Sequence, residues 1–450
     1  MKKTSLAARL AAVVVAAVTT ASVTPASAQS GGAVPSRPEY IPQRAVVIHG
    51  DANKADSTVL AIFYSREDLD FNDPDAPRFL LLDREGKVAF GIGGSLYAVG
   101  SYDFMGAIDS YKFTTYDIAV PNSPDLRQRF GADARYSSLT AKLVGKAGKL
   151  GNFSVYFQAK FQGDDGAYGF KLKQAYATLG HVTAGLANST FVDGSVQAPT
   201  IDPQGASGQV TEKNMLFRYT TSSYRGLKGA ISIEVPSVSI TAGKMMRPGE
   251  TDPQAAAKKI AQRVPDIPAY VQYGWSGGHV RATAMLRNLV YRDLAVDNWQ
   301  GANKFVTGWG VKLSAIGQCG SYLKPFGHIS YGKGISSYVN DLSGNGYDLV
   351  PDGDTGRLKA AESMTWTFGT YVYITPKLFL TGSFSRAQVF GCRDMGGDSF
   401  RYATYGCANA FYNVDDNLRF GAEYLHGMRK NYDGQTGTAN RINVLLQYSF

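Results

Sequence analysis

The sequence predicts an all-β chain that folds as a transmembrane antiparallel β-barrel of about 16 strands. Three observations support this fold class. The chain ends on an alternating strand, it begins with an export signal but has no apolar run of membrane-helix length, and short alternating segments recur from Phe79 onward. A bilayer admits only helices or closed barrels as spanning structures, so an exported membrane chain of this kind must be a barrel. The composition agrees, with 50 glycines, 27 tyrosines and only 18% charged residues.

The closing strand carries the clearest signal. Apolar residues occupy alternate positions and polar residues fall between most of them, which places the apolar set on one face of a strand. A strand of this kind that ends on an aromatic residue is typical of outer-membrane barrels, and we expect Tyr448 and Phe450 to act as the assembly signal. A soluble β-sandwich could also end on an alternating strand. The apolar positions are Ile442, Val444, Leu446, Tyr448 and Phe450.

The first residues form a secretory signal peptide. Lys2 and Lys3 precede an apolar stretch, and Ala26-Ser27-Ala28 supplies a small-residue cleavage site. The apolar stretch is too short to cross a bilayer as a helix, which needs roughly 20 residues. We therefore expect residues 1–28 to be removed, residues 29–78 to form a periplasmic N-terminal arm without barrel periodicity, and residues 79–450 to form the barrel.

Charge narrows the class of partner. The full chain carries a net charge of +9, and removal of Lys2, Lys3 and Arg9 with the signal peptide would leave +6. Outside the cytoplasm, a positive charge favours small anionic solutes or lipopolysaccharide as partners, beside the outer-membrane lipid itself. Export excludes nucleic acid as a partner.

The lengths of the connections predict the orientation and the strand count. Barrels of this type keep their periplasmic turns short and their extracellular loops long. Counting back from Phe450 gives about 16 strands with both ends in the periplasm, or about 18 if Val238 to Met245 adds a pair. Short turns are expected near Gly148, Gly180, Gly226, Gly277, Gly320, Pro376 and Asp415. The long connections are expected at about 103–127, 191–212, 237–265, 292–302, 334–361, 391–402 and 428–439, with a further short one near 163–168.

One connection, residues 191–212, has a restricted backbone. It contains Pro199, Pro203, Gly205 and Gly208 and few residues that would anchor an external lid. We interpret it as a constriction loop that folds inward and narrows the pore; an ordinary exposed loop is the alternative. Its acidic members are Asp193, Asp202 and Glu212.

Basic residues dominate the polar strand faces, which we assign to the lumen. Acids on the same faces are few, namely Asp133, Glu234 and Glu423. Rings of Arg or Lys select for anions in pores. The alternative is that many of these cations pair with acids on the wall or in the loops. The predicted pore-lining residues are Arg129, Arg135, Lys160, Lys171, Lys173, Arg218, Arg281, Arg287 and Arg441.

The cysteines fit an exported chain. Cys392 and Cys407 bracket a loop between two strands, and a near-symmetric hairpin would place them opposite each other. We expect them to form a disulfide, as periplasmic oxidation allows. Cys319 belongs to a predicted periplasmic turn, about a membrane thickness away, and is expected to be a free thiol.

Signals for catalysis are weak. The chain has no G-x-S-x-G, P-loop or H-E-x-x-H motif. His328 and Ser330 share a strand face, and barrel-embedded lipases use a serine and a histidine for catalysis. Such a pair arises easily by chance, however, because residues of one face alternate along a strand. We therefore expect no enzyme activity, no cofactor and no bound metal. The alternatives to a channel are a structural or adhesive barrel with a blocked lumen and, third, a soluble secreted β-protein.

Several short stretches, spread in order over about residues 79–450, resemble the DcaP-like trimeric porins of Gram-negative outer membranes, and more distantly the phosphate-selective porins. The resemblance implies a homotrimer of barrels in the outer membrane that passes small anionic solutes such as dicarboxylates. Two features depart from the family pattern: residues 29–78 show no apolar heptad for the coiled coil found in some members, and Lys171 and Lys173 stand where Arg is expected. The matching stretches are 91–94 (GIGG), 130–137 (FGADARYS), 171–176 (KLKQAY), 285–289 (MLRNL), 331–335 (YGKGI), 421–424 (GAEY) and 439–442 (ANRI).

Overall fold

The computed structural model describes most of the chain from Val46 onward. The predicted signal peptide and the arm up to residue 45 lie outside the described residues. Among the described residues, no helix is both long enough and apolar enough to cross a bilayer. The described residues are 46–49, 56–65, 69–73, 77, 79–83, 85–109, 111–163, 168–240, 258–293, 303–353, 355, 357–392 and 395–450.

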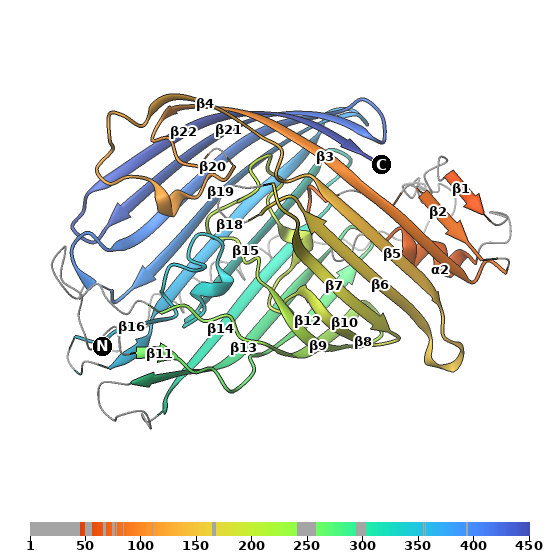
Figure 1. Ribbon diagram of the computed structural model, residues 1–450, viewed down its shortest axis with the longest axis horizontal. Coiled ribbons are helices and arrows are strands. Elements are labelled where there is room, and N and C mark those ends of the chain that lie inside the picture. The colour runs from red at the N-terminus through yellow and green to blue at the C-terminus, as the bar shows by residue number, and fades with distance from the viewer. Residues whose placement is uncertain are drawn as a thin grey trace, which may run out of the picture. The chain divides into compact units, whose positions relative to one another are not determined.

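Sixteen antiparallel strands form a closed barrel, in which each strand bonds to the next and β22 bonds back to β3 (Figure 1). The prediction of about 16 strands is confirmed. β4 and β5 share one position in the wall, because β4 pairs with the second half of β3 and β5 with the first half. The wall strands are β3 (Val88–Met105), β4 (Arg127–Asp133), β5 (Ser138–Lys146), β6 (Asn152–Lys160), β7 (Lys171–Leu179), β8 (Val182–Asn188), β9 (Lys213–Thr220), β10 (Leu227–Glu234), β12 (Ile267–Trp275), β13 (Gly278–Asp293), β14 (Asn303–Gly317), β15 (Leu323–Lys333), β18 (Glu362–Tyr373), β19 (Leu378–Phe390), β20 (Phe400–Asn413), β21 (Leu418–Asn431) and β22 (Thr436–Ser449).

The closing strand shows why the chain forms a barrel. Ile442, Val444, Leu446 and Tyr448 are exposed on the outer face, whereas the residues between them are buried inside. This is the alternation that the sequence predicts. Phe450 completes the seam, since its backbone N–H and C=O both bond to Gly94, each at 2.9 Å.

The connections lie close to their predicted positions. The short turns occur where they are expected, and Gly148, Gly180 and Gly320 adopt the positive φ that favours glycine in such turns. The prediction of a long connection at 428–439 is wrong, because β21 continues to Asn431 and β22 begins at Thr436. β21 and β22 extend beyond the apolar outer band of the barrel. Polar side chains carry little energetic penalty there, so a change to polar residues does not mark the end of a strand.

A small folded unit precedes the barrel wall. β1 (Val46–His49) pairs with β2 (Phe79–Leu82), and β2 pairs with the first residues of β3. Helix α2 (Ser57–Phe63) is capped by Asp56, whose side chain accepts the backbone N–H groups of Thr58 and Val59. The helix buries Val59 and Phe63 against residues of β2, β3 and β5. The sequence pattern does not reveal these elements, because seven helical and four strand residues are too few to show periodicity.

Three connections pack against the inner wall and supply much of the buried core. Residues 106–126 and 189–212 bury Ile108, Phe113 and Val196 against β20 and β21. The connection after β15 packs in the same way against β19 and β20. The remaining elements are η2 (Thr115–Asp117), η3 (Gly148–Leu150), η5 (Gly194–Val196), η6 (Ser336–Tyr338), β11 (Lys258–Ile260), β16 (Leu349–Pro351) and β17 (Leu358–Ala360).

Candidate functional site

The connection 189–212 is bonded to inward-facing side chains far around the barrel from β8 and β9, which it joins. Asp193 Oδ2 bonds to His279 Nε2 of β13 at 2.9 Å and to Ser314 Oγ of β14 at 2.6 Å. Its Gly208 N–H donates to Ser385 Oγ of β19 at 2.8 Å. Two further N–H groups, of residues 201 and 202, donate to the Glu423 carboxylate of β21 at 2.7 and 2.8 Å. The connection therefore runs along the inside of the wall from β13 to β21.

A cavity of about 830 Å³ lies between this connection and the wall formed by β6, β7 and β9. Its polar lining includes residues of the connection 106–126 and of the segment 70–72. The charged residues that line it are Asp70, Lys112, Asp117, Lys160, Lys171, Lys173, Asp202, Glu212 and Lys213.

Three of the lysines come from the neighbouring strands β6 and β7. In β7, a register shift against β6 inserts one extra residue beside Lys173, so that Lys171 and Lys173 both reach the cavity while Gln174 also faces inward. A β-bulge re-aims side chains in this way. Lys160 Nζ lies 2.9 Å from Asp73 and 3.5 Å from the centre of the Tyr136 ring.

The acids lie mainly on the connections. Burial raises the pKa of the Glu212 carboxyl to about 7. Burial also raises the pKa of Asp202, which accepts the backbone N–H of Phe113 at 2.9 Å and that of Gln204 at 3.0 Å. Burial, and to a smaller degree the charge of Lys171, lowers the pKa of Lys112. The cavity is thus lined by ammonium groups of β6, β7 and β9, by Lys112 of the connection 106–126, and by carboxyl groups that lie mainly on the connections.

The predicted arginines are mostly held by partners. Arg287 is fully buried and bonds to Asp266 at 2.9 Å and to Asp348 at 3.1 Å. Arg441 bonds to Asp103 at 2.7 Å and to two backbone carbonyls of the connection 106–126. Of the nine predicted pore-lining residues, only Lys160, Lys171 and Lys173 line the large cavity.

The other predicted arginines lie along the inner wall. Arg135 pairs with Asp133 at 2.6 Å, and Arg281 donates to Gln272 and to the Val192 carbonyl. The two remaining residues are Arg218, which donates to the carbonyl of Asn188 at 3.3 Å, and Arg129, which is exposed on β4 opposite Asp103.

Sequence reasoning missed two lysines that line the cavity. Lys112 lies in a connection without periodicity, so no pattern marks it. Lys213 is the first residue of β9 and has the same parity as the outward-facing Met215 and Phe217. It reaches the cavity only because it stands at the end of the strand. Alternation alone would place it outside.

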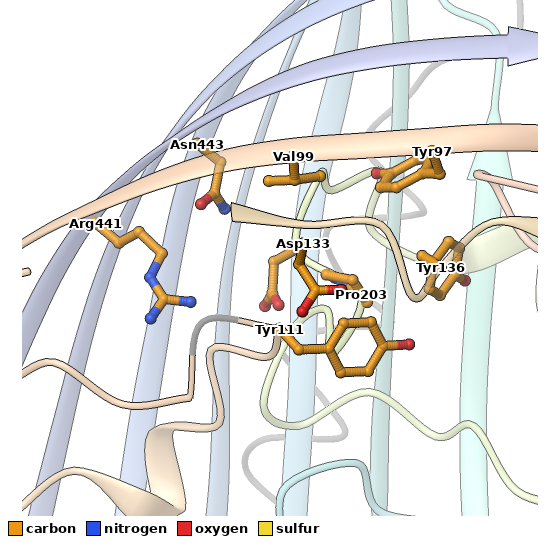
Figure 2. A pocket seen from close by; sticks show the side chains of 9 residues that line it. Tyr97, Val99, Tyr111, Asp133, Tyr136, Pro203, Arg441 and Asn443 are labelled. Atoms are coloured by element: carbon orange, nitrogen blue, oxygen red, sulfur yellow. The ribbon is translucent and has the colours of Figure 1, made fainter. Parts of the chain in front are cut away.

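A second cavity, of about 10 Å³, lies beside Arg441 and is only about large enough for one water molecule (Figure 2). Figure 2 shows Tyr111 and Pro203, which belong to two connections, facing Asp133 and Tyr136. This packing joins both connections to the wall and leaves no space for a solute.

The predicted disulfide is not present. Cys407 is a free thiol in the middle of β20, where it pairs with Ser383 of β19, nine residues before Cys392. Nine strand residues correspond to roughly 30 Å, far beyond the Cα separation that a disulfide allows. The prediction failed because the hairpin between β19 and β20 turns earlier than the two cysteines suggest. Cys319 is a free, exposed thiol, as expected.

His328 and Ser330 have separate partners. His328 Nε2 bonds to the carbonyl of Gly208 at 3.1 Å, and Ser330 Oγ bonds to Thr365 Oγ1 at 2.6 Å. Both side chains therefore stabilise the inner wall, and the described contacts show no bond between them.

Comparisons with known proteins agree with this architecture. The crystal structure of the outer membrane channel DcaP of Acinetobacter baumannii matches with a TM-score of 0.68 and 19% identity, over 82% of this chain and 99% of that chain. An anion-selective porin from Comamonas acidovorans matches with a TM-score of 0.54 and 11% identity, over 81% of this chain and all of that chain. No curated protein matches the sequence. A family model described as the porin subfamily matches residues 129–444, most of the chain, and the protein therefore belongs to the porin subfamily.

Proposed function

We propose that this outer-membrane porin passes small solutes through a water-filled lumen and prefers anions among them. The observation that carries the proposal is the group of five lysines that lines the large cavity, against four acids. Clefts with low-dielectric walls focus the field of such charges and raise the local concentration of counter-ions. The lysines are Lys112, Lys160, Lys171, Lys173 and Lys213.

The connection 189–212 supports the proposal as a constriction loop. It supplies Asp202 and Glu212 to the lining of the cavity, while β6 and β7 supply Lys160, Lys171 and Lys173. Solutes that pass between them experience the charges at short range, where salt screens them less than on a free surface. Lysine is a point charge without the bidentate fork of arginine, so a graded preference for anions fits this lining better than tight binding of one oxyanion.

Small dicarboxylate-like solutes fit a lining of several separated ammonium groups, since each carboxylate can meet a different lysine. The anion-selective porin among the structural matches supports only the fold of such a channel, at 11% identity.

We also propose a homotrimer that is exported with a cleaved signal peptide. β8, β9 and β10 have only 7, 8 and 8 residues, whereas β13 has 16. A tilted strand needs roughly 9–11 residues to cross the bilayer. The part of the wall formed by the short strands β8, β9 and β10 therefore fits contact with a neighbouring subunit better than contact with lipid. Lipid and lipopolysaccharide would cover the rest of the outer face.

The test replaces Lys171 and Lys173 together by Glu and measures the reversal potential of single channels in a salt gradient. We expect the wild type to prefer anions and the double variant to shift toward cations, most strongly at low salt. The matched control is Lys149→Glu with Lys259→Glu, two exposed positions away from the cavity, which makes the same change in net charge.

Two outcomes would count against the proposal. A wild-type preference for cations would reject anion selectivity while leaving the barrel intact. A folded wild type with no conductance would favour the alternative of a structural barrel with a blocked lumen.

A further inference from the structure

A short segment of the N-terminal arm lies inside the barrel. Residues 69–73, the lumenal finger, follow α2 and precede β2 in the chain. Asn72 and Asp73 are buried, at 7% and 3% exposure. The Asn72 side chain donates to the carbonyl of Thr200 at 2.6 Å, and Gln447 of the closing strand donates to the Asn72 carbonyl at 3.1 Å. The finger therefore contacts both the wall and the connection 189–212.

Residues 70–73 of the finger form a turn that is closed by two hydrogen bonds. The backbone N–H of Asp73 donates to the carbonyl of Asp70 at 3.1 Å, and the Asp73 side chain accepts the N–H of Asp70 at 3.0 Å. An aspartate that bonds its neighbouring backbone in this way stabilises a tight turn. The turn is thus a defined structure that can hold the side chains of the finger at fixed positions.

The side chains of the finger reach opposite sides of the barrel. The Phe71 ring packs against Phe411 of β20, with ring centroids 5.2 Å apart, and the Arg419 guanidinium lies 5.3 Å from its centre. In the other direction, Asp70 bonds to Lys213 of β9 at 3.0 Å. The strand pairings place β9 and β20 on opposite sides of the barrel wall, so the finger bridges the lumen.

The finger also changes the charge of the lumen. Asp73 bonds to Lys160 and Asp70 to Lys213, which are two of the five cavity lysines. Burial alone would raise the pKa of Asp73, but the charges of Lys160 and Lys213 outweigh burial and lower it. Asp73 therefore stays ionised at neutral pH, and the finger offsets part of the positive charge that faces a solute.

We infer that the lumenal finger is a flow-limiting and selectivity-determining element of the channel, supplied by the chain's own N-terminal arm. The inference rests on the proposed channel function. Phe71 and the two aspartates join opposite walls beside the cavity, so the finger narrows the path and weakens the anion preference that the lysines create. The finger lies outside residues 129–444, which match the family model, and so belongs to the part of the chain that this family pattern does not describe.

The test compares two variants of the full chain with the wild type in planar bilayers. In the first, Asp70 and Asp73 are replaced by Asn, which keeps the acceptor oxygen of the turn but removes both charges. In the second, residues 69–73 are replaced by Gly-Ser-Gly-Ser-Gly. The matched control is Glu85→Gln with Asp398→Asn, two exposed acids away from the cavity. Heat-modifiable migration on gels confirms that each barrel is folded.

We expect the Asn variant to shift the reversal potential further toward anions, because two lysines lose their counter-charge. We expect the Gly-Ser variant to show the same shift together with a higher single-channel conductance, because the bridge across the bore is removed. The control should match the wild type in both measurements.

The contrary results distinguish the role of the finger from the proposed anion selectivity of the channel. Folded variants with wild-type conductance and reversal potential would overturn the role of the finger, while the Lys171 and Lys173 experiment could still support anion selectivity. If neither wild type nor variants conduct, both the channel and the finger are rejected. A wild-type preference for cations would reject the proposed selectivity alone, because the effect of the finger on conductance is measured independently.

Discussion

At the scale of single residues, most arginines of the inner wall stabilise the fold. Arg287 is fully buried between Asp266 and Asp348, and Arg441 is buried against Asp103. Removing one partner of a buried pair typically costs about 3–5 kcal/mol, because the other charge is left uncompensated. Arginine suits these positions because its planar fork meets several acceptors at once. Three of the predicted lysines, Lys160, Lys171 and Lys173, line the cavity instead.

Glu212 should make ion selectivity depend on pH. Its pKa is raised to about 7, so the carboxyl is mostly ionised at pH 8 and increasingly neutral as the pH falls toward 6.5. Protonation removes a negative charge from the cavity, and we expect the reversal potential to shift toward anions over this range.

The check is the same measurement on Glu212→Gln, which should show a smaller shift of the reversal potential over this range than the wild type. Glu85→Gln, an exposed acid away from the cavity, should keep the wild-type pH dependence. Asp341, whose pKa is raised to about 6 by burial, titrates mainly below the chosen interval. A pH dependence as large in the Gln variant as in the wild type would assign the effect to another group.

At the scale of elements, the inner connections are held by close backbone approach as well as by hydrogen bonds. A Cβ built on Gly208 would lie 2.2 Å from the carbonyl oxygen of Arg386 in β19. Only glycine lets the connection 189–212 approach the wall so closely at this point. By contrast, a Cβ on Gly194 of the same connection would lie 3.8 Å from its nearest neighbour, the Asn188 side chain.

Gly208→Ala should therefore push the connection away from β19 and toward the lumen. We expect a lower single-channel conductance and a loss of stability of roughly 1–3 kcal/mol, as for other overpacked sites. The measurements are conductance in bilayers and the temperature at which the folded barrel converts to the unfolded gel band. Gly194→Ala should behave like the wild type; equal effects of the two substitutions would argue against the close contact with β19.

At the scale of the whole molecule, the barrel is closed by the two ends of its wall. Each wall strand bonds to its neighbour, and β22 returns to β3 over a ladder that ends at Ser449 and Ser95. Phe450 extends this ladder by one residue through its paired backbone bonds to Gly94. Closure leaves no free edge along the wall, which a bilayer requires.

Deletion of Phe450 should reduce the amount of folded barrel in the outer membrane. The deletion removes two backbone hydrogen bonds at the seam, each worth about 1 kcal/mol, together with the terminal aromatic residue. The measurement is the level of the heat-modifiable form in membrane fractions. Phe450→Tyr keeps both features and should assemble normally. Unchanged levels after the deletion would contradict the role assigned to the terminal strand.

Neighbouring residues encode the period-two alternation, the positions of the short turns and the number of strands, so these features follow from the sequence alone. The alternation of Ile442 to Tyr448 and the glycine turns are local signals of this kind. The pairing of charged side chains, by contrast, depends on the folded barrel. Asp70 and Lys213 are 143 residues apart, and Asp103 and Arg441 are 338 apart, so no local pattern couples them. The failed disulfide has the same cause, since the hairpin register, which pairs Cys407 with Ser383, depends on where the chain turns. The large cavity and the finger within it arise where loops and arm meet the wall, and this packing becomes defined only when the barrel closes.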